Sequence, residues 1–234
     1  MSDFIRFPHT PHLAWLAAGS PRDDKVLSPV EAHALLGADV VIEEKLDGAN
    51  LGFSLDEAGA LRAQNRGQYL TEPHTGQFAR LPAWLAQHGP TLQATLKPGL
   101  IVFGEWCAAR HSLHYDHLPD WFLVFDVYDR EAGRFWSTGR RAALAHELGL
   151  LQVPRVDHGR YTLDALKDRL MAAHSHYRHG ELEGLVIRRE SADWCDARAK
   201  LVRPDFTQTI AEHWRRRLIE WNRIQPGHTP PDRP

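Results

Sequence analysis

The sequence is dominated by short apolar segments of strand type, which are separated by turns and by a few helical segments. Strand-type sequence occupies residues 39–45, 49–55, 60–65, 99–106, 121–128, 182–190 and 198–204. Helical sequence occupies residues 29–36, 76–88, 137–150, 163–176 and 207–224. Many strands of antiparallel character, with helices packed outside them, are typical of an α+β fold. We therefore expect antiparallel sheets flanked by helices.

The composition is that of an ordinary globular chain. It has 234 residues, of which 25% are charged and 43% are hydrophobic, and its formal net charge is −2. This length fits one large domain, or one domain with a small appendage. A near-neutral chain has no overall basic field, so binding to a nucleic acid would need a local basic patch.

Cysteine usage and hydropathy bound the cellular setting. Cys107 and Cys195 do not form a CxxC motif, which argues against a zinc cluster or a disulfide framework and favours free thiols. The N-terminal sequence lacks the pattern of a signal peptide, and no apolar stretch approaches the ~20 residues that span a bilayer. We expect a cytoplasmic protein with no membrane partner.

No clear linker divides the chain. Residues 1–206 are expected to form one domain with an N-terminal extension at 1–37. Residues 207–224 predict a basic amphipathic helix, and the proline-containing tail at 225–234 is predicted to be disordered.

Several predicted strands carry a charged residue at or near one end. Lys45 follows the apolar residues of the first strand, and Glu105, Glu183 and Lys200 lie at or within later strands. Each of these alone is most simply a solvated strand end. Together, with Phe125 as an aromatic face, they predict one polar pocket on the sheets. Lysines for phosphates, carboxylates for a ribose hydroxyl and a divalent metal, and an aromatic ring for a base suit a nucleoside triphosphate.

Six short motifs then resemble those of a known superfamily, in its order. They are KLDGAN at 45–50, NRG at 65–67, FGEW at 103–106, VFDVY at 124–128, EGLVIR at 183–188 and AKLVRPDF at 199–206. They are similar to the motifs of the covalent nucleotidyltransferases, which comprise DNA ligases, RNA ligases and mRNA capping enzymes. The resemblance covers roughly residues 38–206. It implies an ATP-grasp-like nucleotidyltransferase domain that carries out adenylylation.

Within that superfamily the sequence looks most like the ATP-dependent RNA ligases. Asn50 occupies a position where DNA ligases usually have arginine. The stretches FPHTPHL and ARHSLHYDHLP also resemble a bacterial and phage branch of RNA ligases. The resemblance implies ATP and Mg²⁺ (or Mn²⁺) as cofactors, and RNA ends with a 5′-phosphate and a 3′-hydroxyl as partners. They would be joined through a lysyl-AMP and an adenylylated RNA end.

The resemblance also implies roles for individual residues. Lys45 would attack the α-phosphate, Lys200 would neutralise charge on it, and Glu183 would hold the metal. Cationic neighbours and the metal would lower the pKa of Lys45, because a protonated lysine is not nucleophilic. The remaining nucleotide contacts would come from the main chain at Glu44, the ribose acceptor Glu105, the stacking ring Phe125, and Asp47, Gly48, Asn50 and Arg66.

The last motif departs from the superfamily pattern. A second lysine is usual two positions after Lys200, where this chain has Val202. Arg198 and Arg203 are the two candidates for the second cation. Strand alternation places Arg198 on the same face as Lys200 and Arg203 on the other, so Arg198 is favoured.

Basic residues outside the pocket are candidate RNA contacts. Arg110 and His111 follow the FGEW motif, whereas a zinc site there is disfavoured because the spacing fits no common pattern. A phosphate-binding patch would include Arg203 and the helix residues Arg215, Arg216, Arg217 and Arg223, although a solvated helix face is an equally simple interpretation.

The remainder of the chain after Phe206 is too short for the OB domain that DNA ligases and capping enzymes carry. We therefore expect a nucleotidyltransferase domain without an OB domain, which a separate RNA-binding or repair partner would assist. The alternatives are a minimal DNA ligase, a guanylyltransferase, and a non-catalytic nucleic-acid-binding protein with a degenerate pocket.

Overall fold

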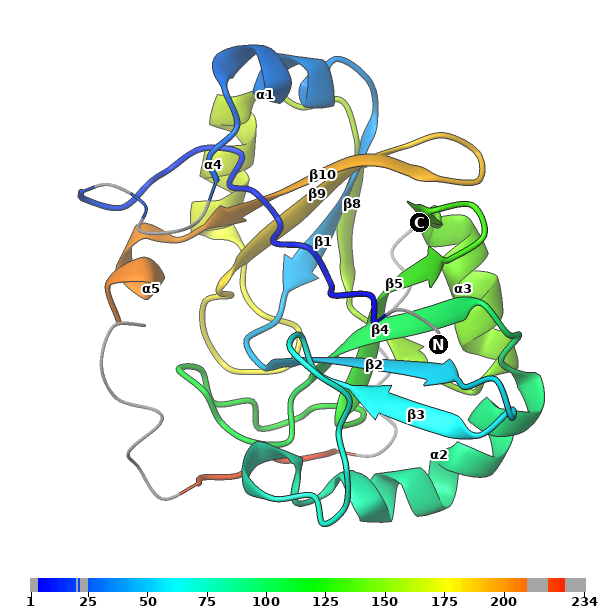
Figure 1. Cartoon of the computed structure of the whole chain (residues 1–234). Coiled ribbons are helices and arrows are strands. Elements are labelled where there is room, and N and C mark those ends of the chain that lie inside the picture. The colour runs from blue at the N-terminus through cyan, green and yellow to red at the C-terminus, as the bar shows by residue number, and fades with distance from the viewer. Residues whose placement is uncertain (1–3, 20, 22–24, 210–218, 226–234) are drawn as a thin grey trace.

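The computed structural model describes residues 4–19, 21, 25–209 and 219–225, which form two sheets with helices on their outer sides (Figure 1). The first sheet has the strand order β10-β9-β1-β8, and all its pairs are antiparallel. Its strands are β1 (Val40–Lys45), β8 (Arg155–Gly159), β9 (Gly184–Glu190) and β10 (Cys195–Val202).

The second sheet has the order β3-β2-β4-β5-β6, with the short β7 pairing parallel to β5. Its strands are β2 (Ala49–Leu55), β3 (Leu61–Gln64), β4 (Leu100–Trp106), β5 (Phe122–Asp129), β6 (Arg134–Phe135) and β7 (Leu151–Gln152). The three residues between β1 and β2 are thus the crossing from one sheet to the other. The strands predicted at 39–45 and 49–55 do not pair with each other.

The helices cover the outer faces of the sheets. Helix α1 (Pro29–Leu36) and α4 (Leu163–Ala172) bury Leu35, Leu166 and Leu170 against the first sheet. Helix α2 (Leu81–Thr95) and α3 (Thr138–Glu147) pack their apolar residues on the second sheet. The mixed α/β arrangement with antiparallel sheets is therefore confirmed.

Local signals set where these helices begin. Ser28 accepts from the amide of Glu31 at 3.3 Å while the Glu31 carboxylate accepts from the amide of Ser28 at 2.8 Å, which is a capping box. Ser137 caps α3. The helix predicted at 76–88 instead divides into a 3₁₀ turn at Gly76–Phe78 and α2, which has proline in its first turn.

The predicted helix at 207–224 is wrong at its far end. Helix α5 covers Pro204–Thr209, and the described residues 219–225 are not helical. There Trp221 bridges Ala109 and Ile224 bridges Leu118, so this segment lies extended along the loop at 109–118. Arg215, Arg216 and Arg217, and the tail after Gln225, lie outside the described residues.

The N-terminal segment connects the two sheets. Phe7 packs edge-on against Phe103 and Phe125 of the second sheet, at ring-centroid distances of 5.0 and 5.1 Å. Further along, the main chain on either side of His12 bonds to Lys200 of the first sheet, whose amide donates to Pro11 and whose carbonyl accepts from Leu13. None of the helices in the described residues is long and apolar enough to span a bilayer.

Candidate active site

A cleft of about 1180 Å³ lies between the two sheets, with the N-terminal segment as part of its wall. It collects residues that are distant in the sequence, from β1, β2, β4, β5, β9 and β10. The predicted site residues that line it are Glu44, Lys45, Asp47, Gly48, Asn50, Arg66, Glu105, His111, Phe125, Glu183, Arg198 and Lys200. The prediction that these strands build one polar pocket is confirmed in geometry, while the roles of the residues stay predictions.

Lys45 ends β1 and is ion-paired. Its Nζ lies 2.7 Å from Glu183 Oε1, because β1 and β9 pair so that Lys45 lies opposite Gly184. About a quarter of the Lys45 side chain is exposed, against one twentieth of that of Glu183. Burial alone would lower the pKa of Lys45, but the charges of Glu183 and Glu105 outweigh it and the pKa is raised. The expected lowering by cationic neighbours is therefore not found in the protein alone.

The two carboxyls beside Lys45 are shifted strongly. Burial raises the pKa of Glu105 to about 7 and that of Glu183 to about 8, and the nearby charge of Asp47 adds to both shifts. One oxygen of Glu105 accepts a hydrogen bond from the amide of Gly48 at 3.0 Å. Lys45, Asp47, Asn50, Glu105 and Glu183 are called the Lys45 cluster below. The cluster brings three carboxyls to one ammonium group.

Asp47 and Gly48 shape the crossing between the sheets. One oxygen of Asp47 accepts from the amides of Ser112 and Leu113 at 2.8 and 2.7 Å, and the amide of Asp47 donates to the Tyr115 hydroxyl at 2.8 Å. A Cβ at Gly48 would lie 2.6 Å from the carbonyl oxygen of Trp106. Asp47 therefore fixes the neighbouring loop, and only glycine fits after it.

Asn50 supplies an unused acceptor in the cleft. Its Oδ1 is buried and has no hydrogen-bond partner among the described residues. Asn50 lies opposite Glu105 in the β2–β4 ladder, so the amide and the carboxyl line the same part of the cleft. A buried acceptor without a partner is costly, which fits a ligand donor at this place.

Glu44 is held by a second loop. Its carboxylate accepts from the Ser175 hydroxyl at 2.6 Å and from the amide and ring Nδ1 of His176 at 2.9 and 2.8 Å. Its own amide donates to the carbonyl of Pro154 at 2.9 Å. The amide of Glu44 is therefore already used, and a base edge would have to meet other main-chain groups of this strand.

The two candidates for the second cation are placed differently. Arg198 and Lys200 both line the cleft, as alternation predicts, but Arg198 Nη1 lies 2.5 Å from Asp126 and its guanidinium stacks over Phe135 at 4.0 Å. Arg203 is 5% exposed and contacts the carbonyl of Leu170 and the carboxylate of Glu181. Arg203 is buried where the chain turns into α5, and its contact with RNA stays a prediction.

Sequence reasoning missed a buried group of ion pairs at the other end of the cleft, called the arginine network. Arg188 Nη1 lies 2.9 Å from Asp126, and Arg141 Nη2 lies 2.5 Å from Glu43. The full set comprises Glu43, Asp126, Arg141, Arg188, Glu190 and Arg198. Arg141 and Arg188 both donate to the carbonyl of Phe125 as well. The only local signal was a charge inside an apolar strand, as at Arg188.

Of the remaining basic candidates for RNA contact, His111 lines the cleft and Arg110 does not. The ring Nε2 of His111 lies 2.8 Å from the side-chain oxygen of Gln77, and burial lowers the pKa of His111. Arg110 is more exposed, does not line the cleft, and pairs with Glu220 at 2.5 Å. Contact of either residue with RNA stays a prediction, as it does for Arg223, which is exposed.

Solved structures similar to this fold include those of an RNA ligase. A lysine-to-alanine variant of Naegleria gruberi RNA ligase with ATP and Mn matches with a TM-score of 0.61 and 17% identity, over 86% of this chain and 63% of that one. An apo lysine-to-alanine variant gives 0.60 and 19%, over 86% and 62%. The ligase with PPi gives 0.57 and 18%, over 87% and 63%.

These likenesses show the fold, and this chain spans about three fifths of the length of those proteins. Among curated proteins, no match is found. The family model for RNA ligase matches residues 38–202, which is most of the chain and contains all but the end of the motif series. The chain therefore belongs to the RNA ligase family.

Proposed function

We propose that this protein is an ATP-dependent RNA ligase that joins a 5′-phosphate end to a 3′-hydroxyl end. The observation that carries the proposal is the Lys45–Glu183 pair, at 2.7 Å, at the sheet crossing in the cleft. Similar structures of Naegleria gruberi RNA ligase contain ATP, AMP or PPi, several of them with Mn. In this proposal the two sheets form a nucleotidyltransferase domain.

The residues in the cleft fit a nucleotide and a divalent metal. Asn50 offers a buried acceptor without a partner, and Gly48 leaves space that a side chain would fill. Glu183, with Glu105 and Asp47 near it, forms the all-oxygen set that magnesium or manganese prefers. Phe125 and Arg66 line the cleft for the base and the ribose or phosphate side. A bound metal would supply charge neutralisation at the phosphates.

The first step is attack by Lys45. Its Nζ loses a proton, forms a bond to the α-phosphorus of ATP, and pyrophosphate leaves. Glu183 lies within hydrogen-bond distance of Nζ and holds the amine at the end of β1. Lys200 lines the same cleft and would neutralise charge on the α-phosphate. AMP then passes to the RNA 5′-phosphate, and the 3′-hydroxyl displaces it.

Labelling of the protein tests this step. Incubation with α-labelled ATP and Mg²⁺ should give a labelled protein, and Lys45→Ala should reduce the label by at least about 10³-fold because the nucleophile is gone. Lys97→Ala is the matched control, since Lys97 is an exposed lysine outside the cleft. Equal labelling of Lys45→Ala and the parent would contradict the proposal.

The choice of RNA as substrate needs a separate assay. Nicked duplexes with RNA ends and with DNA ends should be offered to the labelled protein in parallel. Faster sealing of the RNA nick is expected from the family. Preference for the DNA nick would overturn the RNA part of the proposal and leave the adenylylation part standing.

A further inference from the structure

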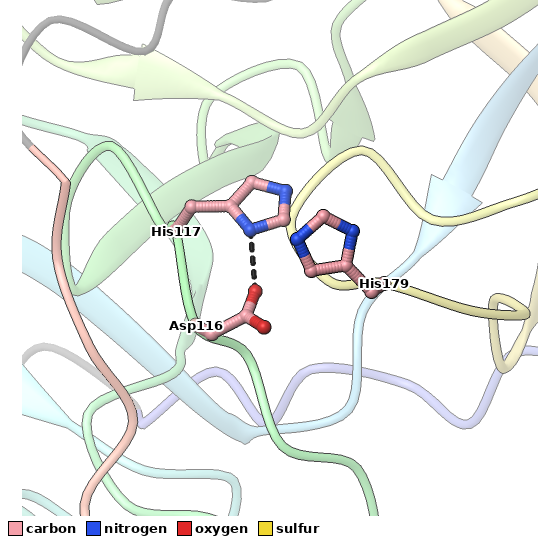
Figure 2. Close-up of side chains that lie close together, drawn as sticks. All are labelled: Asp116, His117 and His179. Carbon is pink, nitrogen blue, oxygen red and sulfur yellow. Dashed lines mark hydrogen bonds and ion pairs between the residues drawn. The ribbon is translucent and has the colours of Figure 1, made fainter.

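Two histidines and an aspartate gather away from the cleft, at the meeting of two loops. Asp116 and His117 lie in the loop that precedes β5, and His179 lies in the loop between α4 and β9. Figure 2 shows the three side chains turned toward one another, with His117 Nδ1 bonded to the Asp116 carboxylate. One donor atom from each residue lies within 4.8 Å of the other two.

The positions of these three residues are fixed by main-chain hydrogen bonds. The amides of Asp116 and His117 both donate to the carbonyl of Tyr177, at 3.2 and 3.4 Å, and Tyr177 is fully buried. The second loop is closed on itself, because the amide of Ser175 donates to the carbonyl of Gly180 at 2.9 Å. The side chains are therefore brought together by backbone that is already held, which lowers the entropy cost of binding a ligand.

We propose that Asp116, His117 and His179 bind a divalent transition-metal ion, for which zinc is the best match. Two imidazole nitrogens and one carboxylate oxygen are a common zinc set, with water in the remaining position. The residue spacing within 108–117 fits no common zinc motif. The reason is that this segment supplies only Asp116 and His117, while the third ligand, His179, comes from a distant loop. The nitrogen ligands separate this site from the oxygen-only group around Glu183.

The two loops of the proposed site both hold the residues that flank Lys45. The loop containing Asp116 and His117 also supplies Tyr115, whose hydroxyl accepts from the amide of Asp47. The loop containing His179 also supplies His176, which contacts the carboxylate of Glu44. A metal ion bound by both loops would fix Tyr115 and His176, and with them Asp47 and Glu44 on the two sides of Lys45. The site thus has a positioning role and does not touch the reacting atoms.

Zinc binding to chelator-treated protein without nucleotide tests the proposal. Calorimetric titration with zinc chloride should show one tight site, and His179→Ala should weaken it by at least about 100-fold because a ligand is removed. His146→Ala is the matched control, since His146 is an exposed histidine on α3 and should bind zinc like the parent. Equal affinity in His179→Ala and the parent, or no tight site in the parent, would overturn the proposal.

Two further measurements keep the result independent of folding defects and of the ligase proposal. Zinc at about 100 times its Kd should raise the unfolding temperature of the parent by about 5 to 10 °C, and should not raise that of Asp116→Asn. Glu183→Gln should keep the zinc site, because Glu183 is not among its ligands. Loss of zinc binding in Glu183→Gln would place the ion in the cleft and contradict the proposed site.

Discussion

The cleft holds two groups of charged residues that differ in how completely their charges are compensated. The arginine network sets three guanidinium groups, of Arg141, Arg188 and Arg198, against three carboxylates. The Lys45 cluster sets one ammonium against three carboxyls and contains the Asn50 acceptor, which has no hydrogen-bond partner in the described part of the chain. Both groups join residues of the first and second sheets.

This difference separates the structural role of the arginine network from the reactive role that we propose for the Lys45 cluster. The arginine network pairs each carboxylate with a guanidinium, and it fixes the two sheets relative to each other through Phe125 and α3. In the Lys45 cluster, burial raises the pKa of Glu105 and Glu183 and the charge of Asp47 adds to both shifts, so a ligand that brings positive charge would stabilise the carboxylates. The Lys45 cluster is therefore where a bound divalent metal ion would gain most, because the metal brings the positive charge.

The largest effect is expected from breaking the arginine network. Arg141→Met should lower the free energy of unfolding by about 3–5 kcal/mol, because the Glu43 carboxylate would stay buried with its nearest guanidinium gone. Denaturant unfolding measures it. Arg140→Met, the adjacent residue on α3, should cost no more than about 1 kcal/mol, since its guanidinium stacks on Trp136 and Trp194 and makes one long hydrogen bond, of 3.5 Å, to the carbonyl of Asp193. Equal losses of unfolding free energy in the two variants would show that the arginine network contributes no more to stability than the Arg140 side chain does.

The next effect concerns the shape of the crossing beside Lys45. Gly48→Ala should reduce labelling by ATP about 100-fold, because a Cβ 2.6 Å from the Trp106 oxygen forces the backbone next to the nucleophile to shift. Single-turnover labelling is the measurement. Gly67→Ala, also in the cleft, should label normally because its added Cβ meets nothing closer than 3.6 Å. A normal rate in Gly48→Ala would refute the steric argument.

A smaller effect separates binding from stability at Asn50. Asn50→Ala should weaken ATP binding about tenfold while the nucleotide-free protein keeps or gains about 1 kcal/mol of stability, since a buried acceptor without a partner is removed. ATP titration and unfolding should be measured on the same sample. Asn65→Ala should instead lose stability, because its side-chain oxygen accepts from the amides of Gly67 and Gln68. Parallel loss of both properties in Asn50→Ala would contradict this.

The last prediction concerns the alkylation rate of Cys195, which reports on burial beside the arginine network and is not a measure of activity. Burial raises the pKa of the Cys195 thiol to about 11, despite the nearby charge of Arg188. Its alkylation at pH 8 should therefore be about 100-fold slower than that of an ordinary thiol, and should keep rising with pH up to about 11. Peptide-level mass spectrometry follows the rate. A plateau near pH 9 would mean that the site is open to water.

Features with a local cause were predictable from the sequence. The strand at Val40–Lys45 follows from its run of three apolar residues, the strand at Ala49–Leu55 follows from apolar alternation, and α1 follows from Ser28 and Pro29. Strand β8 was missed because residues 155–159 contain few apolar residues and lie at a sheet edge. Residues 219–224 have a helical sequence pattern. The buried Asn222 side chain instead donates to the carbonyls of Cys107 and Ala109, and these tertiary contacts override the helical propensity.

The sequence predicted which residues line the cleft better than it predicted which of them contact each other. The motifs name Lys45, Glu105, Glu183 and Lys200, all of which line the cleft. The partner of Arg198 was not readable, because Asp126 belongs to the other sheet and no spacing along the chain relates the two. The same limit applies to the pKa of Lys45, which depends on the carboxyls of Glu183, Glu105 and Asp47.

The N-terminal segment imposes an order of events during synthesis of the chain. Its main chain bonds at Pro11 and Leu13 to Lys200, so residues made before β1 complete the wall of the cleft together with residues of β10, which is made after all the other strands of the two sheets. Such sequence-distant pairing slows folding and cannot form while β10 is still within the ribosome. A nascent chain is therefore expected to gain this cleft only after β10 has emerged from the ribosome.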